Sequence, residues 1–139
     1  MSFSTLLLKY KDQVGVLALQ KINSAEQNSA EHKIFTKVEF EAGYAGGDGS
    51  WRRYLQNNLN TDVPGSNGAP KGQYMVIVRF IVAKDGSVSD VVAETKHGFG
   101  MEKESVRVII NSGKWTPAIQ NGRNVTSYKR QPITWVVSE

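Results

Sequence analysis

One stretch decides the fold: residues 74–95, which read YMVIVRFIVAKDGSVSDVVAET. Its first ten residues are rich in β-branched and aromatic side chains. Both alternating faces are mostly apolar, which is typical of a central strand covered on both sides. Asp85-Gly86 follows, a dipeptide that supplies the positive φ angles of a tight turn. Residues 88–95 then have the composition of a partner strand. The stretch therefore predicts an antiparallel β-hairpin.

A helix is predicted on the N-terminal side of this hairpin. Ser50 is a favourable N-cap residue, because its hydroxyl can accept a hydrogen bond from an amide of the first turn. One helical face then carries a mostly apolar stripe: Trp51, Tyr54, Leu55, Asn58 and Leu59. Residues 62–72 contain two prolines and three glycines, so we expect a loop between this helix and the hairpin.

A second helix is predicted on the C-terminal side of the hairpin, over residues 101–112. Gly113 stands in the usual position for ending a helix. Glu104 and Arg107 have the spacing of a favourable pair on the helix surface. The side that we expect to be buried carries three apolar residues: Val106, Ile109 and Ile110.

A last strand is predicted over residues 131–137, after a second hairpin-type turn at Asn121-Gly122. The element order is then helix, strand, strand, helix, strand. This order predicts an α+β fold in which two helices pack on one face of a small antiparallel sheet.

An extra helix is expected at the N-terminus, because apolar side chains recur there at helical spacing. They are Phe3, Leu7, Tyr10, Val14 and Leu17. A polar segment follows. We therefore expect two parts, residues 1–37 with the amphipathic helix and linker, and residues 38–139 with the α+β domain.

The composition narrows the classes of function. The chain has 139 residues, the size of one ordinary domain, and no cysteine, which excludes disulfides, thiolate nucleophiles and cysteine-based zinc sites. Its formal net charge of +4 is spread along the sequence without a basic arm. No apolar stretch is long enough to cross a bilayer. Membrane contact is therefore expected only through a partner or through an anchor missing from this sequence.

Two glycine-rich segments resemble nucleotide-binding loops but lack their decisive residues. The cluster at Gly46, Gly47 and Gly49 precedes a helix, yet no Gly-Lys-Ser/Thr ending follows it. Gly98-Phe99-Gly100 also precedes a helix, but Lys103 stands where the dinucleotide fingerprint requires a third glycine. We expect neither segment to hold a cofactor.

No catalytic or metal-binding constellation is expected either. His97 lies near Glu102 and Glu104 in the sequence, but no nucleophile motif or histidine pair at ligand spacing accompanies it. Nucleic-acid binding is not expected, because Tyr74 and Phe80 share their strand face with valines, which is the pattern of a core rather than of a stacking platform. The sequence predicts a binding module and not an enzyme.

Five fragments, in the same order, resemble the C-terminal domain of the TonB family. They are residues 51–59, the hairpin 76–91, residues 100–109, the Lys114–Ala118 segment, and the closing run through Asn121-Gly122 and residues 132–135. The resemblance covers about residues 38–137. It implies a TonB C-terminal-like fold and a place in the periplasm of a Gram-negative bacterium.

The resemblance also implies a partner. In the family, this domain grips a short peptide of an outer-membrane receptor, which adds as a strand beside the last strand and links the domain to energy-dependent transport. A free strand edge offers backbone hydrogen bonds for affinity and alternate side chains for selectivity. The implied partner-binding residues are Tyr128, Arg130, Gln131, Ile133, Thr134, Trp135 and Val136. A homodimer through the same edge is the other expected partner.

The chain departs from the family after the first predicted helix. The family often carries Tyr-Pro there, whereas this chain has Asp62-Val63-Pro64 in a longer loop. That loop lies near the partner in the family, so Asp62 and Pro64 join the expected partner-binding residues. Two alternatives stay open. Tyr128-Lys129-Arg130 either attracts an acidic peptide or guards the edge against aggregation, and the whole domain either binds a receptor or serves as a scaffolding or sensing part of an envelope assembly.

Overall fold

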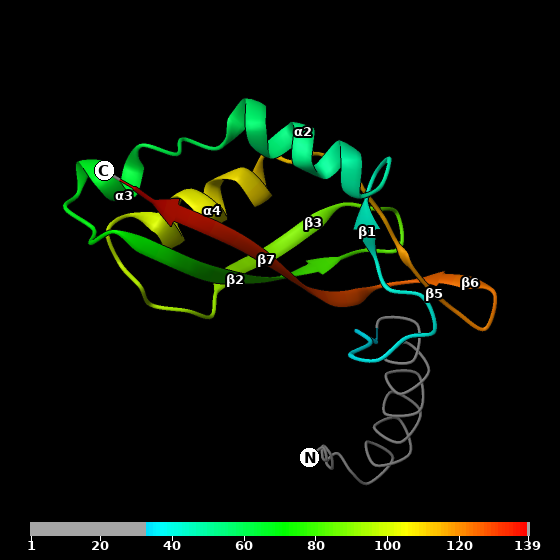
Figure 1. Cartoon of the computed structure of the whole chain (residues 1–139). Helices are drawn as coiled ribbons and strands as arrows, with labels where there is room; N and C mark the ends of the chain where they lie inside the picture. Colours follow the sequence, from blue (N-terminus) through cyan, green and yellow to red (C-terminus); the bar gives the residue numbers. More distant parts are fainter. Residues whose placement is uncertain (1–32, 139) are drawn as a thin grey trace, which may run out of the picture. The chain divides into compact units, whose positions relative to one another are not determined.

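The main sheet has three antiparallel strands in the order β3-β2-β7 in the computed structural model, which describes residues 33–138. The central strand β2 (Gly72–Val82) pairs with β3 (Val88–Ala93) on one side and with β7 (Ser127–Val137) on the other (Figure 1). The predicted hairpin is thus confirmed. The last strand begins at Ser127 rather than at residue 131. The predicted N-terminal helix lies outside the described residues.

The hairpin turn depends on Gly86. Its φ of 90° is positive, and its carbonyl oxygen accepts a hydrogen bond of 2.8 Å from the amide of Trp115. A side chain at this position would collide with the Trp115 carbonyl group. Asp85 does not have the positive φ that the sequence predicted. Its carboxylate instead accepts hydrogen bonds from the amide and the hydroxyl of Ser87, at 2.9 and 2.7 Å.

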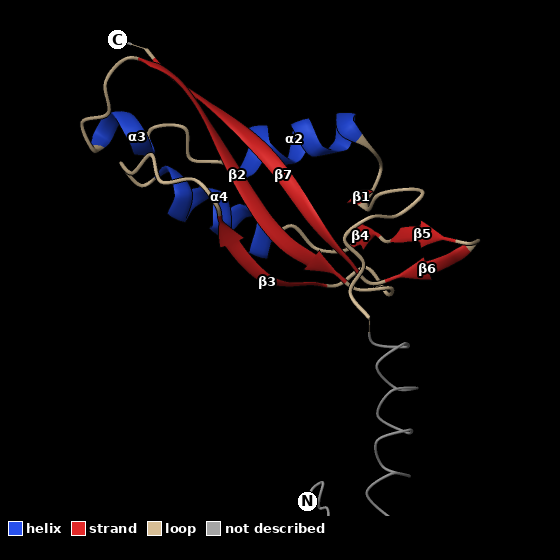
Figure 2. Ribbon diagram, turned by 90° about the horizontal axis from the view of Figure 1, so that it is seen from below, coloured by secondary structure: helices blue, strands red, loops and turns tan. Residues whose placement is uncertain are grey.

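Three helices lie on the same side of the sheet (Figures 1 and 2). They are α2 (Asp48–Asn58), α3 (Val63–Ser66) and α4 (Met101–Ile110). The predicted fold class, α+β with helices on one face of a small antiparallel sheet, is confirmed. The region expected to be only a loop contains the short helix α3, which Pro64 near its first position favours.

The helix ends and faces differ in detail from the prediction. Helix α2 begins at Asp48 with Gly47 as its N-cap, so Ser50 lies inside the first turn and is not the cap. In α4, Ile110 is 58% exposed and Val106 is half-buried, whereas Met101, Ser105, Val108 and Ile109 are buried. The buried face is therefore rotated from the predicted one. Glu104, expected on the surface, is buried as well.

Short strands extend the fold beside the main sheet. Strand β1 (Gly43–Tyr44) pairs with β4 (Trp115–Thr116), and β5 (Ala118–Gln120) pairs with β6 (Arg123–Val125). Both residues of the turn between β5 and β6 have positive φ, 54° at Asn121 and 74° at Gly122, as a two-residue type I′ hairpin requires. The second predicted turn is confirmed.

The core lies between the helices and one face of the sheet. On β2, that face carries four fully buried side chains: Val76, Val78, Phe80 and Val82. Trp51, Trp115 and Trp135 pack into the same cluster. The opposite face of β2 is more open than predicted, with Met75 51% exposed. Within residues 33–138, only one face of the central strand is therefore fully covered.

Candidate functional site: a free strand edge

Strand β7 has β2 along one side only. The two strands pair in unbroken register from Gly72 opposite Val137 to Val82 opposite Ser127. Within residues 33–138, the other side of β7 carries a single isolated bridge, between Phe35 and Ser127, at the start of the strand. The rest of this side is an edge with no paired strand in the described part of the chain.

The register shows which residues of β7 face this edge. Ile77 of β2 directs its backbone away from β7, because its carbonyl accepts from the amide of Glu94 at 2.8 Å and its own amide donates to the Thr95 hydroxyl at 3.4 Å. Opposite residues of an antiparallel pair face either each other or away from each other. Pro132, opposite Ile77, therefore faces the free edge, and so do the other even-numbered residues of β7.

One hydrogen bond confirms this assignment independently. The amide of Tyr128, an even-numbered residue, donates to the carbonyl oxygen of Phe35 at 3.0 Å on the outer side of β7. Beyond it, the edge presents the amides of Arg130, Thr134 and Val136. Pro132 contributes only a carbonyl oxygen, because proline has no backbone N–H. A proline facing outward on an edge strand is also a common protection against indiscriminate pairing.

The structure divides the predicted partner-binding residues of β7 into two groups. Tyr128, Arg130, Thr134 and Val136 are exposed and have outward-facing backbone groups. Ile133 and Trp135 are each only 2% exposed. Gln131, which points to the same side of the sheet, is half-buried. Trp135 also donates its indole N–H to the Ser105 hydroxyl at 3.0 Å. These inner residues hold the strand in place and offer no free side chain to a partner.

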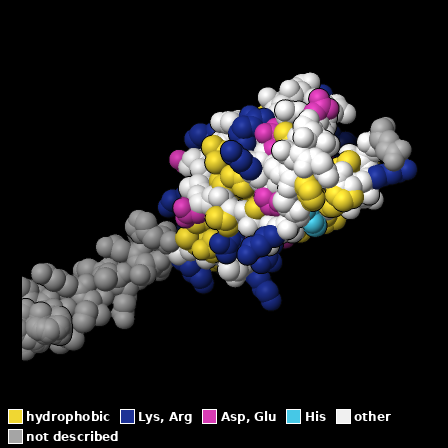
Figure 3. All heavy atoms as spheres, turned by 90° about the vertical axis from the view of Figure 1, so that its left-hand side faces the viewer, with side chains coloured by type: hydrophobic (Ala, Val, Ile, Leu, Met, Phe, Trp, Pro, Cys, Tyr) yellow, Lys and Arg dark blue, Asp and Glu magenta, His cyan; other side chains and the backbone are white. Residues whose placement is uncertain are grey.

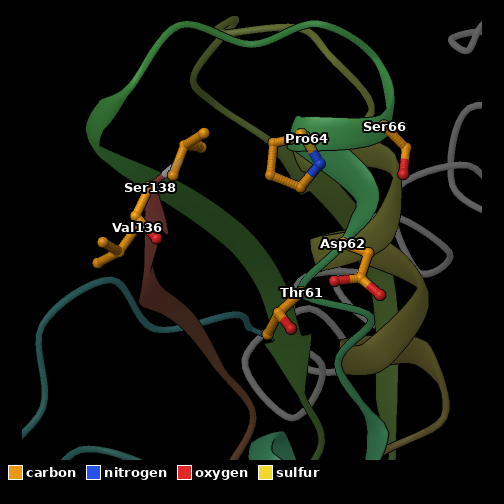
Figure 4. Close-up of a pocket in the computed structure, with 8 residues that line it drawn as sticks. Thr61, Asp62, Pro64, Ser66, Val136 and Ser138 are labelled. Carbon is orange, nitrogen blue, oxygen red and sulfur yellow. The ribbon is translucent and has the colours of Figure 1, made fainter.

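The two loop residues predicted for the site are brought to the end of this strand. Asp62 and Pro64, from the α3 region, line a hollow of about 440 Å³ together with Val136 (Figure 4). Thr61, Ser66 and Ser138 complete its labelled rim in the figure, with Ser138 and Val136 opposite the α3 side. The sequence separation between Asp62 and Val136 is large, so only the tertiary fold joins them.

A partly buried ionic network fixes the α3 region against α4. The carboxylate of Glu104 accepts a hydrogen bond of 2.8 Å from the amide of Asn60 and two more, of 2.8 and 2.7 Å, from Arg107. Arg107 also donates to the carbonyl oxygen of Asn58 at 2.8 Å. The hydrogen bond from Arg107 and that from Asn60 outweigh partial burial and hold the pKa of Glu104 below its usual range. The sequence indicated the Glu104–Arg107 pair but not Asn60, which is remote in the chain.

A second contact holds the other end of α3. The side-chain amide of Asn67 donates to the carbonyl oxygens of Val63 and Phe99, at 2.8 and 3.1 Å. Gly100 approaches α3 so closely that an added Cβ would lie 2.7 Å from the Val63 side chain. The Gly98-Phe99-Gly100 segment is therefore a packing contact for α3.

Charged residues at the start of β7 already have acidic partners elsewhere in the domain. Arg130 forms an ion pair of 2.8 Å with Glu94, and Lys129 forms one of 3.4 Å with Glu41. The guanidinium of Arg79 lies over the ring of Tyr128, 5.4 Å from its centre. On the face drawn in Figure 3, Lys and Arg side chains form separate groups with acidic and hydrophobic side chains between them.

The histidine and carboxylates that suggested acid–base chemistry have structural partners. The Nε2 of His97 lies 2.7 Å from the carbonyl oxygen of Met75, and its ring packs edge-on against Tyr74. Glu102 accepts hydrogen bonds from the amides of His97 and Gly98 and from the hydroxyl of Thr95. Partial burial raises the pKa of Glu102, but these hydrogen bonds outweigh it, so the pKa lies below its usual range. The amide of Gly98 is thus already occupied by the carboxylate of Glu102.

Two further properties concern metals and membranes. In residues 33–138, no three histidine or acidic side chains gather as metal ligands would. No helix in the same part of the chain has the length and apolar character needed to span a bilayer.

Comparison with protein families shows which known domain this sheet resembles. Residues 73–137 match the family model described as Gram-negative bacterial TonB protein C-terminal. Over these residues the chain is similar to a TonB C-terminal domain. No curated protein and no solved structure matches the chain.

The match spans the chain from β2 to β7 and so includes the whole main sheet and α4. The TonB C-terminal domain is a protein-interaction domain related to energy transduction in the cell envelope, and domains of this family generally interact with outer-membrane receptors. The helices α2 and α3 lie outside the matched residues, although they pack on the same core and α3 lines the hollow.

Proposed function

We propose that this TonB C-terminal-like domain binds an extended peptide of an outer-membrane receptor, which adds as a strand to the free edge of β7. The observation that carries the proposal is the outward-facing backbone of β7 after Tyr128, which no described residue pairs. Residues 38–139 are the proposed binding unit. In this proposal the domain works in the periplasm, and binding is linked to energy-dependent transport across the outer membrane.

The backbone groups on the edge define what a peptide gains. The amides of Arg130, Thr134 and Val136 can donate to peptide carbonyl oxygens, and the carbonyl oxygens of the same residues and of Pro132 can accept. Each such bond contributes about 0.5–1.5 kcal/mol net, so several are needed for useful affinity. Pro132 interrupts the row of donors at its centre, which favours a peptide whose matching carbonyl group can remain solvated.

The side chains on the edge define selectivity. A strand that adds to β7 places alternate side chains on the open face, beside Tyr128, Arg130, Thr134 and Val136. The charge of Arg130 is already balanced by Glu94, and the ring of Tyr128 is covered by the guanidinium of Arg79. These contacts support a guarding role at the start of the edge and leave the second half of β7 as the more accessible part.

The proposal is tested by a titration of the ¹⁵N-labelled chain with synthetic peptides from the periplasm-facing N-termini of outer-membrane receptors. The largest amide shifts are expected at Arg130, Thr134 and Val136. Smaller shifts are expected at Ile133 and Trp135, whose amides point toward β2. Shifts centred on another surface, or none with any peptide on a folded monomer, would contradict strand addition and favour the scaffolding alternative.

A pair of variants sharpens this test. A proline at Ile133 or Trp135 would break the β2–β7 ladder and damage the fold itself. Val136→Pro removes an outward amide instead. It should weaken binding of any peptide that causes NMR shifts at the edge amides. Val136→Thr keeps the amide and is the matched control, with affinity close to that of the natural chain. Equal losses in both variants would point to the side chain and not to the backbone. Concentration-dependent shifts without peptide would identify a second copy as the occupant.

A further inference from the structure

The hollow at the end of β7 differs in chemistry from the rest of the edge. It is lined by the α3 region on one side and by the last residues of β7 on the other. Among residues 33–138, Asp62 is its only charged lining residue, and Thr61 and Ser66 add hydroxyl groups (Figure 4). The hollow is therefore a polar site with one negative charge.

The carboxylate of Asp62 is available to a ligand. Asp62 occupies the N-cap position of α3, but its side chain makes no capping hydrogen bond. Its backbone groups are used, with the amide donating to Asn60 and the carbonyl accepting from Ser66. Within residues 33–138 its carboxylate has no hydrogen bond or ion pair. By contrast, Arg130 and Lys129 at the other end of the edge have acidic partners.

The alternation of an added strand would direct one side chain into this hollow. The odd-numbered residues of β7 point to the side of the sheet that the helices cover, as the burial of Ile133, Trp135 and Val137 shows. A peptide residue beside an odd-numbered position points to the same side. Beside Val137, that side is occupied by the hollow rather than by packed core.

We propose that the hollow is a subsite for a basic side chain of the bound peptide, Lys or Arg, at the residue that lies beside Val137, with Asp62 as the counter-charge. This inference rests on the proposed function, because it needs a strand on the edge of β7. It assigns the partner a chemical feature, an extended segment with one cationic residue near the end that reaches α3. The network of Glu104, Arg107 and Asn60 fixes the residues just before α3, which form one side of the hollow.

The test uses acetylated and amidated nonapeptides of alternating Thr and Val, in which a single lysine is moved along the sequence. Each peptide is compared with its norleucine counterpart, which has a similar length and no charge. The expected result is a preference for lysine at one position of about threefold or more at low salt, the size expected for an exposed ion pair, and a decrease of this preference as salt is added. Asp62→Asn should remove the preference.

A matched control removes the same charge elsewhere. Asp90 is exposed on β3, at the opposite edge of the sheet, and Asp90→Asn should keep the lysine preference. Equal affinity for lysine and norleucine peptides, with normal shifts at Thr134 and Val136, would overturn the subsite and leave strand addition standing. Absence of all shifts would overturn both. A preference that survives Asp62→Asn would also overturn the assignment of a side chain to Asp62.

Discussion

The amide of Tyr128 donates a 3.0 Å hydrogen bond to the carbonyl oxygen of Phe35, on the side of β7 that β2 does not cover. The amide of Phe35 in turn donates to the carbonyl oxygen of Thr126 at 2.9 Å, so residue 35 runs parallel to the start of β7. This short contact shows that the outer side of β7 has the geometry to accept a strand. It also sets the limit of the free edge, because a peptide can occupy only the part after Tyr128.

The first prediction concerns hydrogen exchange of the free protein. The amides of Thr134 and Val136 face outward, whereas those of Ile133 and Trp135 face β2. We expect Thr134 and Val136 to exchange about tenfold or more faster than their neighbours, and Tyr128 to be protected by Phe35. Exchange monitored by NMR, residue by residue, checks this alternation. Equal protection along the whole of β7 in a monomer would mean that its outer side is covered.

The second prediction concerns Pro132. Pro132→Thr adds an outward N–H at the centre of the edge, so a peptide that adds to β7 should bind more tightly by about 0.5–1.5 kcal/mol, roughly 2- to 12-fold in Kd. Thr134→Pro removes a donor two residues away and should weaken binding by a similar factor. Affinities by calorimetry, with sedimentation to measure self-association, check both. Changes of the same sign in the two variants would contradict the assigned orientation of the strand.

The third prediction concerns Glu104. Glu104→Gln keeps the shape of the side chain but loses the charge that binds Arg107 and the Asn60 amide. We expect the free energy of unfolding to fall by about 1–2 kcal/mol. Glu41→Gln is the control, because Glu41 is an exposed partner of Lys129 and should change stability by no more than about 0.5 kcal/mol. Urea unfolding at neutral pH measures both; equal effects would show that the Glu104 network is not structural.

The fourth prediction concerns pH. The pKa values of Glu104 and Glu102 lie below their usual range in the folded chain, because both carboxylates accept several hydrogen bonds. Groups with a lowered folded pKa stabilise the fold fully above their unfolded pKa, about 4.3, and lose that contribution as the pH falls toward the folded pKa. Stability should therefore decline below about pH 5. In the Glu102→Gln and Glu104→Gln variants, the free energy of unfolding should change less with pH over that range. An unchanged pH dependence would disprove the assignment.

Local signals were enough to predict the main elements. The apolar run of β2, the Asp85-Gly86 turn and the Asn121-Gly122 turn depend on neighbours in the sequence, and these features lie where they were predicted. The predicted helix ends were less accurate: the N-cap of α2 is Gly47 and not Ser50. Helix α3 was missed, since a four-residue helix with proline and glycine has no periodic pattern to detect.

The candidate site could be predicted only in part, because it depends on contacts between residues far apart in the sequence. The sequence and the family resemblance indicated the last strand, but which of its residues face outward depends on the register with β2. Ile133 and Trp135 therefore appeared beside Thr134 and Val136 in the predicted site, although their side chains lie in the core. The meeting of Asp62 with Val136 depends on α4 holding the α3 region, a long-range arrangement that no local pattern encodes.

The unbroken ladder between β2 and β7 has a mechanical consequence. Hydrogen bonds of an antiparallel pair lie perpendicular to the strand direction. A pulling force along β7, or along a strand added to its edge, would therefore load all the bonds of the ladder in shear at the same moment. A force across the strands would instead open them one after another, like a zipper. With eleven residues of β7 held beside β2, the domain is built to resist tension along this one axis far better than across it.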